Sequence, residues 1–366
     1  MPSSLIPRPP SLYGAPYSAP WWLPGGHAQT IYAALVVPRP RVAYRRERWE
    51  TPDGDFIDVD WVVTPADEAR RFNLTGRKDY TQRPLSNEDP IFKIMEPATV
   101  PLVVLFHGLE GSSRSHYALA LMAAVRDAGW RGAVVHFRGC SGEPNRLPRA
   151  YHSGDAPEID WIVRRLRAQD PATPLFASGV SLGGNVLLKW LGETGASATE
   201  VVDRAAAVSA PVDVMTTGDA LGEGFNLVYT WNFLATLKRK ALAKYSMYSG
   251  LFDAARVRAA FTLREFDDLV TAPLHGFKDA DDYWTRASSK PVLRNIRVPT
   301  LILNARNDPL VPAPALPRAG EVSAAVTLEQ PEQGGHAGFV SGRFPGNLDW
   351  LPQRVLEFFS VNAENS

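Results

Sequence analysis

Short apolar runs that alternate with helical stretches constrain the fold of this chain more than any other feature of its sequence. Each run has the length of a buried strand, and the stretches after the first three runs place apolar residues at helical spacing. The runs are residues 101–106, 132–137, 174–178, 204–209, 299–304 and 324–329. Strands of a parallel sheet are buried on both faces, and the helices that connect them cover those faces. We therefore predict an α/β fold with a mostly parallel central sheet and helices on both of its faces.

The strand pattern is interrupted between residues 209 and 299. Inside this interval, residues 227–245 have the apolar spacing of a helix. A helical cap at about residues 211–290, inserted into a single α/β body, explains the interruption. The chain of 366 residues is long enough for two domains, but one body over residues 42–366 accounts for all the predicted strands.

Two further segments lie outside the predicted sheet. Prolines crowd the N-terminal stretch and predict that it has no regular structure. Its cluster Trp21-Trp22-Leu23 is too apolar for a solvated tail, so we expect residues 1–41 to form an arm that docks on the body. Residues 66–97 are polar and lack a sustained apolar period, which predicts a long surface insertion between strands.

The pattern predicts two strands, residues 45–50 and 56–63, joined by a tight turn that contains Pro52, Asp53, Gly54 and Asp55. An Asp-Gly pair between two such runs is a hairpin signal. The acidic residues also raise the alternative of a calcium loop. The ligand order of a calcium loop is missing, however, so we predict the hairpin.

The pentapeptide Gly179-Val180-Ser181-Leu182-Gly183 carries the strongest local signal for chemistry. It follows an apolar strand directly and precedes a helical stretch, which is the setting of a nucleophile elbow. Outside that setting, a Gly-x-Ser-x-Gly match indicates no more than a turn. The sharp turn lifts the serine hydroxyl above the end of the sheet and requires small residues at positions 179 and 183. We predict that Ser181 is a nucleophile.

A serine nucleophile needs a histidine base that a carboxylate orients, and in α/β hydrolases the acid and then the histidine follow the serine in the chain. Asp308 follows the apolar run 299–304, and His336 follows the run 324–329 within a glycine-rich loop. Both lie beyond strand ends, where catalytic groups gather in open parallel sheets. We therefore predict an α/β-hydrolase fold with a triad. Ser181 is its nucleophile, His336 its general base and then acid, and Asp308 the carboxylate that orients the histidine.

Acyl transfer also needs hydrogen-bond donors for the oxyanion that develops on the substrate. The residue after the nucleophile supplies one backbone N–H, which here belongs to Leu182. The second donor is expected from the loop His107-Gly108-Leu109-Glu110-Gly111, which follows an earlier strand. Because glycines flank it, we choose the backbone N–H of Leu109.

The remaining histidines and the single cysteine carry weaker signals. We expect His116, His136 and Cys140 to be structural, and we leave open whether His27 docks the arm or has a function and whether His152 approaches the site. His275 with Asp279, Asp281 and Asp282 resembles a metal cluster by composition, but a solvated acidic loop is the better interpretation. We predict no metal and no cofactor, because no nicotinamide, flavin or P-loop pattern is present.

The composition narrows the class of partner. The chain has 39 basic and 39 acidic side chains, which disfavours a nucleic-acid partner because phosphate neutralisation requires a basic surplus. One cysteine excludes an intramolecular disulfide, and no apolar run reaches the length of a membrane span or of a secretory signal. We expect a cytoplasmic protein that acts on a small-molecule ester with a lipophilic acyl group.

Several motifs together resemble the YheT-like family of α/β hydrolases. They are Gly26-His27-Ala28-Gln29-Thr30, Pro52 to Phe56, His136 to Arg146, Tyr151 to Gly154, the elbow with Gly184-Asn185, Phe266-Asp267-Asp268-Leu269, His275-Gly276 and Gly334 to Phe339. The resemblance covers nearly the whole chain and implies an esterase or lipase with a Ser-Asp-His charge relay at the three predicted positions. The chain departs from the family pattern at Tyr283-Trp284, where paired tyrosines are expected, and in the length of residues 66–97.

The leading hypothesis is therefore a serine hydrolase of carboxylic esters, either short-chain acyl esters or acylglycerols, that forms an acyl-enzyme. An acyltransferase with the same triad is the first alternative, because the acceptor decides between the two reactions. A lipase that associates with a lipid interface is the second, since Leu227, Val228, Trp231 and Leu234 precede the basic run 238–240 on one predicted helix. The same helix could instead be a lid whose apolar side covers the pocket. The third alternative is a non-catalytic protein on this scaffold. The sequence leaves the oligomeric state open.

Overall fold

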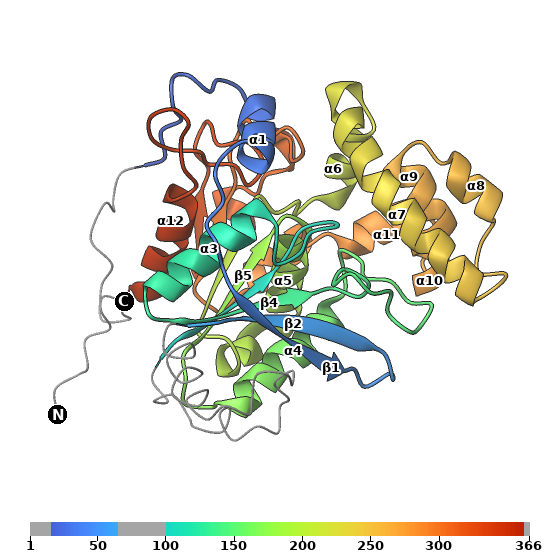
Figure 1. The fold of residues 1–366 in the computed structure, drawn as a ribbon, viewed down its shortest axis with the longest axis horizontal. Helices are drawn as coiled ribbons and strands as arrows, with labels where there is room; N and C mark the ends of the chain where they lie inside the picture. Colours follow the sequence, from blue (N-terminus) through green and yellow to red (C-terminus); the bar gives the residue numbers. More distant parts are fainter. Residues whose placement is uncertain (1–15, 65–99, 362–366) are drawn as a thin grey trace, which may run out of the picture.

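An eight-stranded sheet forms the centre of the molecule (Figure 1). The computed structural model describes residues 16–64 and 100–361. The strands are β1 Tyr44–Glu50, β2 Phe56–Val62, β3 Leu102–Phe106, β4 Arg131–His136, β5 Leu175–Val180, β6 Arg204–Val208, β7 Thr300–Leu303 and β8 Val326–Glu329. Their order is β1-β2-β4-β3-β5-β6-β7-β8, with antiparallel pairing only at β1, β2 and β4. The predicted α/β-hydrolase fold with a mostly parallel sheet is confirmed.

Helices cover both faces of this sheet, and the alternation of side chains along β3 shows how. Leu102, Val104 and Phe106 point into one apolar cluster with α4 (Ala156–Gln169) and α5 (Leu182–Thr194). Val103 and Leu105 point into a second cluster with α3 (His116–Asp127) and α12 (Trp350–Ser360). Since successive side chains of a strand lie on opposite faces, a continuous apolar run is what a strand buried on both faces requires.

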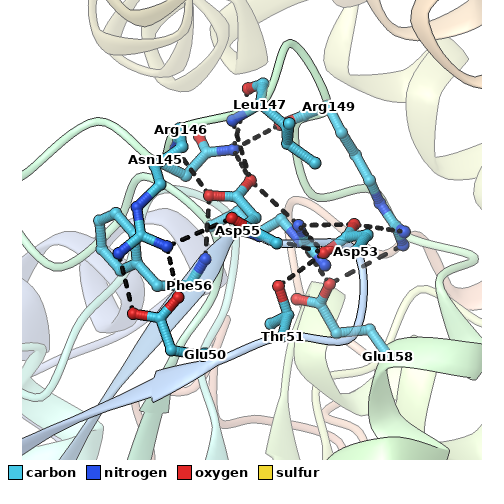
Figure 2. Close-up of polar contacts among 12 residues, drawn as sticks. Glu50, Thr51, Asp53, Asp55, Phe56, Asn145, Arg146, Leu147, Arg149 and Glu158 are labelled. Atoms are coloured by element: carbon cyan, nitrogen blue, oxygen red, sulfur yellow. Dashed lines mark hydrogen bonds and ion pairs between the residues drawn. The ribbon is translucent and has the colours of Figure 1, made fainter.

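Strands β1 and β2 form the predicted hairpin, in which Glu50 pairs with Phe56 across the turn. The Asp55 carboxylate at this turn is fully buried and accepts hydrogen bonds from Asn145 Nδ2 (2.6 Å), Arg138 (3.0 Å) and the backbone N–H of Arg146 (2.6 Å) (Figure 2). Its oxygens therefore fix the turn to the loop after β4. Asp55 thus has a structural role in the hairpin and does not belong to a calcium loop.

The arm contains a helix, so the prediction that prolines exclude regular structure from this segment is wrong. Helix α1 spans Gly26–Leu35, which lies in the longest proline-free interval of the arm, between Pro24 and Pro38. Residues Leu23, Ala33 and Val37 are buried in a small cluster with Val340 and Leu348 near the other end of the chain. The described part of the arm, residues 16–41, thus packs on the body.

Six α-helices lie between β6 and β7, within the range predicted for a cap, and we call residues 211–290 the cap. They are α6 Val214–Leu221, α7 Leu227–Met247, α8 Ala254–Ala259, α9 Leu263–Phe266, α10 Ala272–His275 and α11 Ala280–Ala287. A π-helical turn, Asp267–Thr271, joins α9 to α10. In Figure 1 the cap, in yellow and orange, stands beside the sheet as a separate group of helices.

Helix α7 ties the cap to the body through two lysines. Lys240 Nζ lies 2.7 Å from the carboxylate of Glu110, and Lys244 Nζ donates to the backbone carbonyls of Asn145 and Leu147. Leu234 also faces inward, at 3% exposure, whereas Trp231 is 48% exposed. The apolar and basic residues proposed for a lipid-binding face therefore do not share one face of this helix.

The predicted insertion at residues 66–97 lies outside the described residues. Among the described residues, no helix combines the length and the apolar character needed to cross a membrane.

Candidate active site

Ser181 occupies the turn between β5 and α5 with φ at 55°, a conformation that side-chain-bearing residues rarely adopt. Close packing around the turn imposes this geometry. A Cβ on Gly179 would lie 2.4 Å from the carbonyl oxygen of Gly183, and a Cβ on Gly183 would lie 2.3 Å from that of Phe106. Only glycine fits at either position, so the sequence Gly-x-Ser-x-Gly is a steric requirement of this elbow.

His336 joins the other two residues of the predicted triad. Its Nδ1 lies 2.8 Å from Asp308 Oδ2, and its Nε2 lies 2.9 Å from Ser181 Oγ. The second oxygen of Asp308, Oδ1, accepts hydrogen bonds from the backbone N–H groups of Leu310 (2.8 Å) and Val311 (3.1 Å). With Asp308 only 3% exposed, these bonds fix its carboxylate on the imidazole. The structure thus brings together the three side chains that the sequence placed at separate strand ends.

The loop that carries His336 is fixed by side chains from three distant segments. The backbone N–H groups of residues 334 to 337 donate in turn to Gln29 Oε1 (2.9 Å), Asn307 Oδ1 (3.0 Å), Thr30 Oγ1 (2.9 Å) and Ser209 Oγ (2.9 Å). Gln29 Oε1 also accepts a hydrogen bond from Asn307 Nδ2 (3.0 Å). Helix α1 therefore bridges the loop of the histidine and the loop of the aspartate.

The two residues predicted to supply the oxyanion donors, Leu109 and Leu182, line the same cavity as Ser181. Around Leu109, the N–H of Gly108 donates to the Tyr117 hydroxyl (2.9 Å), and that of Glu110 donates to the Tyr151 hydroxyl (2.8 Å). The loop is also tight, because a Cβ on Gly108 would lie 3.0 Å from the Cβ of Ser181. This arrangement holds the loop that contains Leu109 against the elbow.

The cavity over Ser181 and His336 has a body side and a cap side. Residues of the loops after β3 and β4 line the body side together with the predicted site residues: Leu109, Tyr151, His152, Ser153, Ser181, Leu182 and His336. The cap side is mainly apolar and includes Val214, Leu221, Phe233, Leu237, Leu263 and Phe266. Because Phe233 and Leu237 belong to α7, this helix covers the cavity as the lid hypothesis expects.

The other histidines occupy varied settings. His152 lines the cavity, and its ring packs 4.4 Å from that of His275. His136 is buried and bonded to Asp60 (2.9 Å), as a structural residue would be. His27 stacks on Tyr229 of the cap at 5.8 Å between ring centroids. Within residues 16–64 and 100–361, no cluster of histidine, cysteine and acidic side chains has the arrangement of a metal site.

Cys140 is poorly suited to react as a thiolate. Burial raises the pKa of its thiol to about 11, and Lys240 Nζ lies 3.3 Å from its sulfur. Since the thiolate is the nucleophilic form, a thiol with this pKa is largely unreactive at neutral pH. The geometry agrees with the expectation of a structural cysteine.

Sequence reasoning missed Gln29, Thr30, Ser209 and Asn307 as residues of the site. The signal for the first two was present, because they belong to the segment Gly26 to Thr30 that carries part of the family resemblance. Glycine 26 belongs to the same arrangement, since a Cβ there would lie 1.9 Å from the carbonyl oxygen of Asn307. The close approach of α1 to the aspartate loop explains why a glycine begins this helix.

Comparisons with known proteins agree with this geometry. A family model of the α/β hydrolase fold matches residues 101–342. The chain is 35% identical over 92% of its length to "Putative esterase YheT" of Escherichia coli K12, covering 91% of that protein. It is 27% identical to phospholipase ABHD3 of Homo sapiens over 94% of the chain and 78% of the relative. It is 26% identical to the monoacylglycerol lipase of Saccharomyces cerevisiae over 93% of the chain and 79% of the relative.

The matched fold model and the length of these alignments define the class, and the chain belongs to the α/β hydrolase family. Within that family it groups with esterase- and lipase-type members such as YheT, as the sequence motifs predict.

Proposed function

We propose that this protein is a serine hydrolase of carboxylic esters. The observation that carries the proposal is the position of His336, which bridges Ser181 Oγ (2.9 Å) and Asp308 Oδ2 (2.8 Å) through its two ring nitrogens. This is the geometry in which an imidazole accepts the serine proton while the carboxylate orients it. The apolar lining of the cavity supports a substrate with a lipophilic acyl group.

The reaction follows from these positions. Ser181 Oγ attacks the ester carbonyl while His336 Nε2 takes its proton, and the N–H groups of Leu109 and Leu182 stabilise the oxyanion. His336 then gives the proton to the leaving alcohol, which leaves the acyl group on Ser181. In the second half, His336 activates a water molecule that releases the acid. Relatives named phospholipase and monoacylglycerol lipase support lipid esters as substrates to be tested.

The test is a series of p-nitrophenyl esters from acetate to palmitate, with fluorophosphonate labelling of the wild type and of Ser181→Ala. We expect turnover and labelling in the wild type and a loss of about a millionfold in kcat in the variant. Ser178→Ala is the matched control, since Ser178 lies on β5, the strand that leads into the elbow, but its hydroxyl is buried outside the cavity. If the wild type neither hydrolyses any ester nor accepts the label on Ser181, the proposal is wrong.

We also propose peripheral contact with a lipid surface through the outer side of the cap. Trp231 and Phe261 are 48% and 54% exposed, and their rings contact each other at 5.5 Å. Phe225, just before α7, and Val228, in the first turn of α7, are also exposed. Exposed aromatic and aliphatic side chains that gather on one surface favour burial at a membrane interface. The cytoplasmic location predicted from the sequence stays a prediction.

A further inference from the structure

Two polar side chains on the cap side of the cavity have no role in the proposed triad. Asp267 and Thr217 both line the cavity that Ser181 opens into, although the wall around them is mainly apolar. Asp267 belongs to the run Phe266 to Leu269, which the sequence singled out and the triad leaves without a role. It begins the π-helical turn Asp267–Thr271, a distortion that often marks functional sites in helices.

The Asp267 carboxylate is fixed by two neutral donors. Thr271 Oγ1 donates to Oδ1 (2.6 Å), and Trp284 Nε1 donates to Oδ2 (2.8 Å). A carboxylate can accept about four hydrogen bonds, so each oxygen retains capacity. Asp267 forms no ion pair with the lysines, arginines and histidines of the described part of the chain. Burial raises its pKa to about 6, so the carboxylate is largely ionised at neutral pH and needs hydrogen bonds.

Thr217 supplies a second and independent observation. Its side chain is buried at 6% exposure, and its Oγ1 has no hydrogen-bond partner among the described residues. Buried hydroxyl groups are nearly always paired, so an unpaired one that lines a cavity indicates a partner that enters that cavity.

Trp284 lies between Asp267 and the helix that carries Thr217. The next residue after Thr217 is Gly218, where a Cβ would lie 2.6 Å from the Trp284 ring. Helix α6 therefore packs directly on the indole whose N–H binds Asp267. Thr217, Asp267 and Trp284 all line the cavity.

We propose that Asp267 and Thr217 form a subsite for a hydroxyl group of the substrate. That hydroxyl donates to the free capacity of the carboxylate and accepts from the threonine hydroxyl, and a single oxygen atom serves both partners. The substrate is then an ester that carries a free hydroxyl group on its acyl chain or on its alcohol. This inference rests on the proposed function, because it takes Ser181 as the reacting group.

The experiment compares each hydroxyl ester with its methyl ether. One pair is 2-hydroxyethyl and 2-methoxyethyl hexanoate, and the other is the p-nitrophenyl esters of 6-hydroxyhexanoate and 6-methoxyhexanoate. We expect kcat/KM of the wild type to favour the hydroxyl ester by about tenfold or more in at least one pair, since a charged acceptor loses its donor in the ether. Thr217→Val and Asp267→Asn should each bring this ratio towards one, mainly by slowing the hydroxyl ester.

The matched control is Thr216→Val, which makes the same change on the same helix at a residue outside the cavity lining. It should keep the ratio of the wild type. If Asp267→Asn fails to fold in a thermal melt, Thr217→Val decides alone, because valine matches the shape of threonine.

A ratio near one in a wild type that labels at Ser181 and hydrolyses esters overturns the subsite and leaves the proposed function intact. An equal ratio in the wild type and in Thr217→Val overturns it as well. A stronger preference for the ester of 6-aminohexanoate would overturn the hydroxyl assignment in favour of an ammonium group. Absence of both labelling and hydrolysis would instead remove the proposed function itself.

Discussion

The body side and the cap side of the cavity differ in how their polar groups are satisfied. On the body side, both oxygens of Asp308 and both ring nitrogens of His336 have partners at 2.8 to 3.1 Å. On the cap side, the hydroxyl of Thr217 lines the cavity and has no partner among the described residues. A fully paired network is held in one arrangement before substrate binds, whereas unpaired groups await a partner. We therefore propose that the body carries out the chemistry and that the cap selects the substrate.

Substitution of Asp308 should give the largest contrast between the two sides. In Asp308→Asn, Oδ1 still accepts from Leu310 and Val311, but the amide can place a donor against Nδ1 of His336. The wrong tautomer of the imidazole then faces Ser181, and we expect kcat for a p-nitrophenyl ester to fall by about 10⁴. The cap variant Thr217→Val should stay within about threefold on the same unfunctionalised ester. Similar losses in both variants would contradict the division between body and cap.

The next effect concerns α1, which acts through the histidine loop rather than on the substrate. Thr30→Val removes the acceptor for the N–H of His336 (2.9 Å), and Gln29→Leu removes that for Gly334 (2.9 Å). Because small displacements of catalytic groups are costly, we expect kcat to fall about ten- to a hundredfold with KM nearly constant. The rate of fluorophosphonate labelling should fall in parallel, which a loss of stability alone would not produce.

Tyr32→Phe is the matched control for α1. Its hydroxyl donates to the carbonyl of Pro345 (3.1 Å), away from the loops of Asp308 and His336. This variant should label and turn over substrate at the rate of the wild type. Equal losses in Tyr32→Phe and Thr30→Val would show that α1 contributes stability only.

The sequence predicted the triad residues on the body side, because their positions follow from the order of the strands. Ser181, Asp308 and His336 could be found because each follows an apolar run, and parallel strands bring their C-terminal ends to one edge. The bridge from Gln29 to the histidine loop could not be found in this way, since it joins residues 305 positions apart through packing of α1. Thr217 was equally hidden, and the motif Phe266 to Leu269 marked Asp267 without giving it a role, because their significance depends on lining one cavity.

Acid should destabilise the fold through four histidines with lowered pKa values, three in the body and one in the cap. Burial lowers the pKa of His107 to about 3, of His116 and His152 to about 4 and of His275 to about 3. These groups bind more protons unfolded than folded, so their stability contribution is complete above about pH 6.5 and is lost as the pH falls. Glu158 and Asp267, with pKa values raised to about 7 and about 6, act in the opposite direction but are fewer.

We therefore expect the free energy of unfolding in urea to fall by about 1 to 3 kcal/mol between pH 6.5 and 5.5. His107 Nε2 accepts from the N–H of Phe137 (3.2 Å), so its Nδ1 donates to the carbonyl of Gly108 (2.8 Å) in the loop of Leu109. His107→Gln, which cannot take up a proton, should be less stable at pH 7 but lose less between the two pH values. A free energy of unfolding that is constant or rises towards pH 5.5 would contradict the lowered pKa values of these histidines.

The smallest effect on catalysis should come from the outer surface of the cap, and it tests whether selectivity there includes contact with lipid. Trp231→Ser combined with Phe261→Ser removes two exposed rings that line no part of the cavity. Hydrolysis of a water-soluble ester should stay within about twofold, because the triad and the cavity wall are unchanged. Co-sedimentation with anionic and with neutral phospholipid vesicles should fall severalfold, since each ring contributes apolar area at the interface. A wild type that binds neither kind of vesicle would reject the lipid contact, and the cap would then select substrates through its inner wall alone.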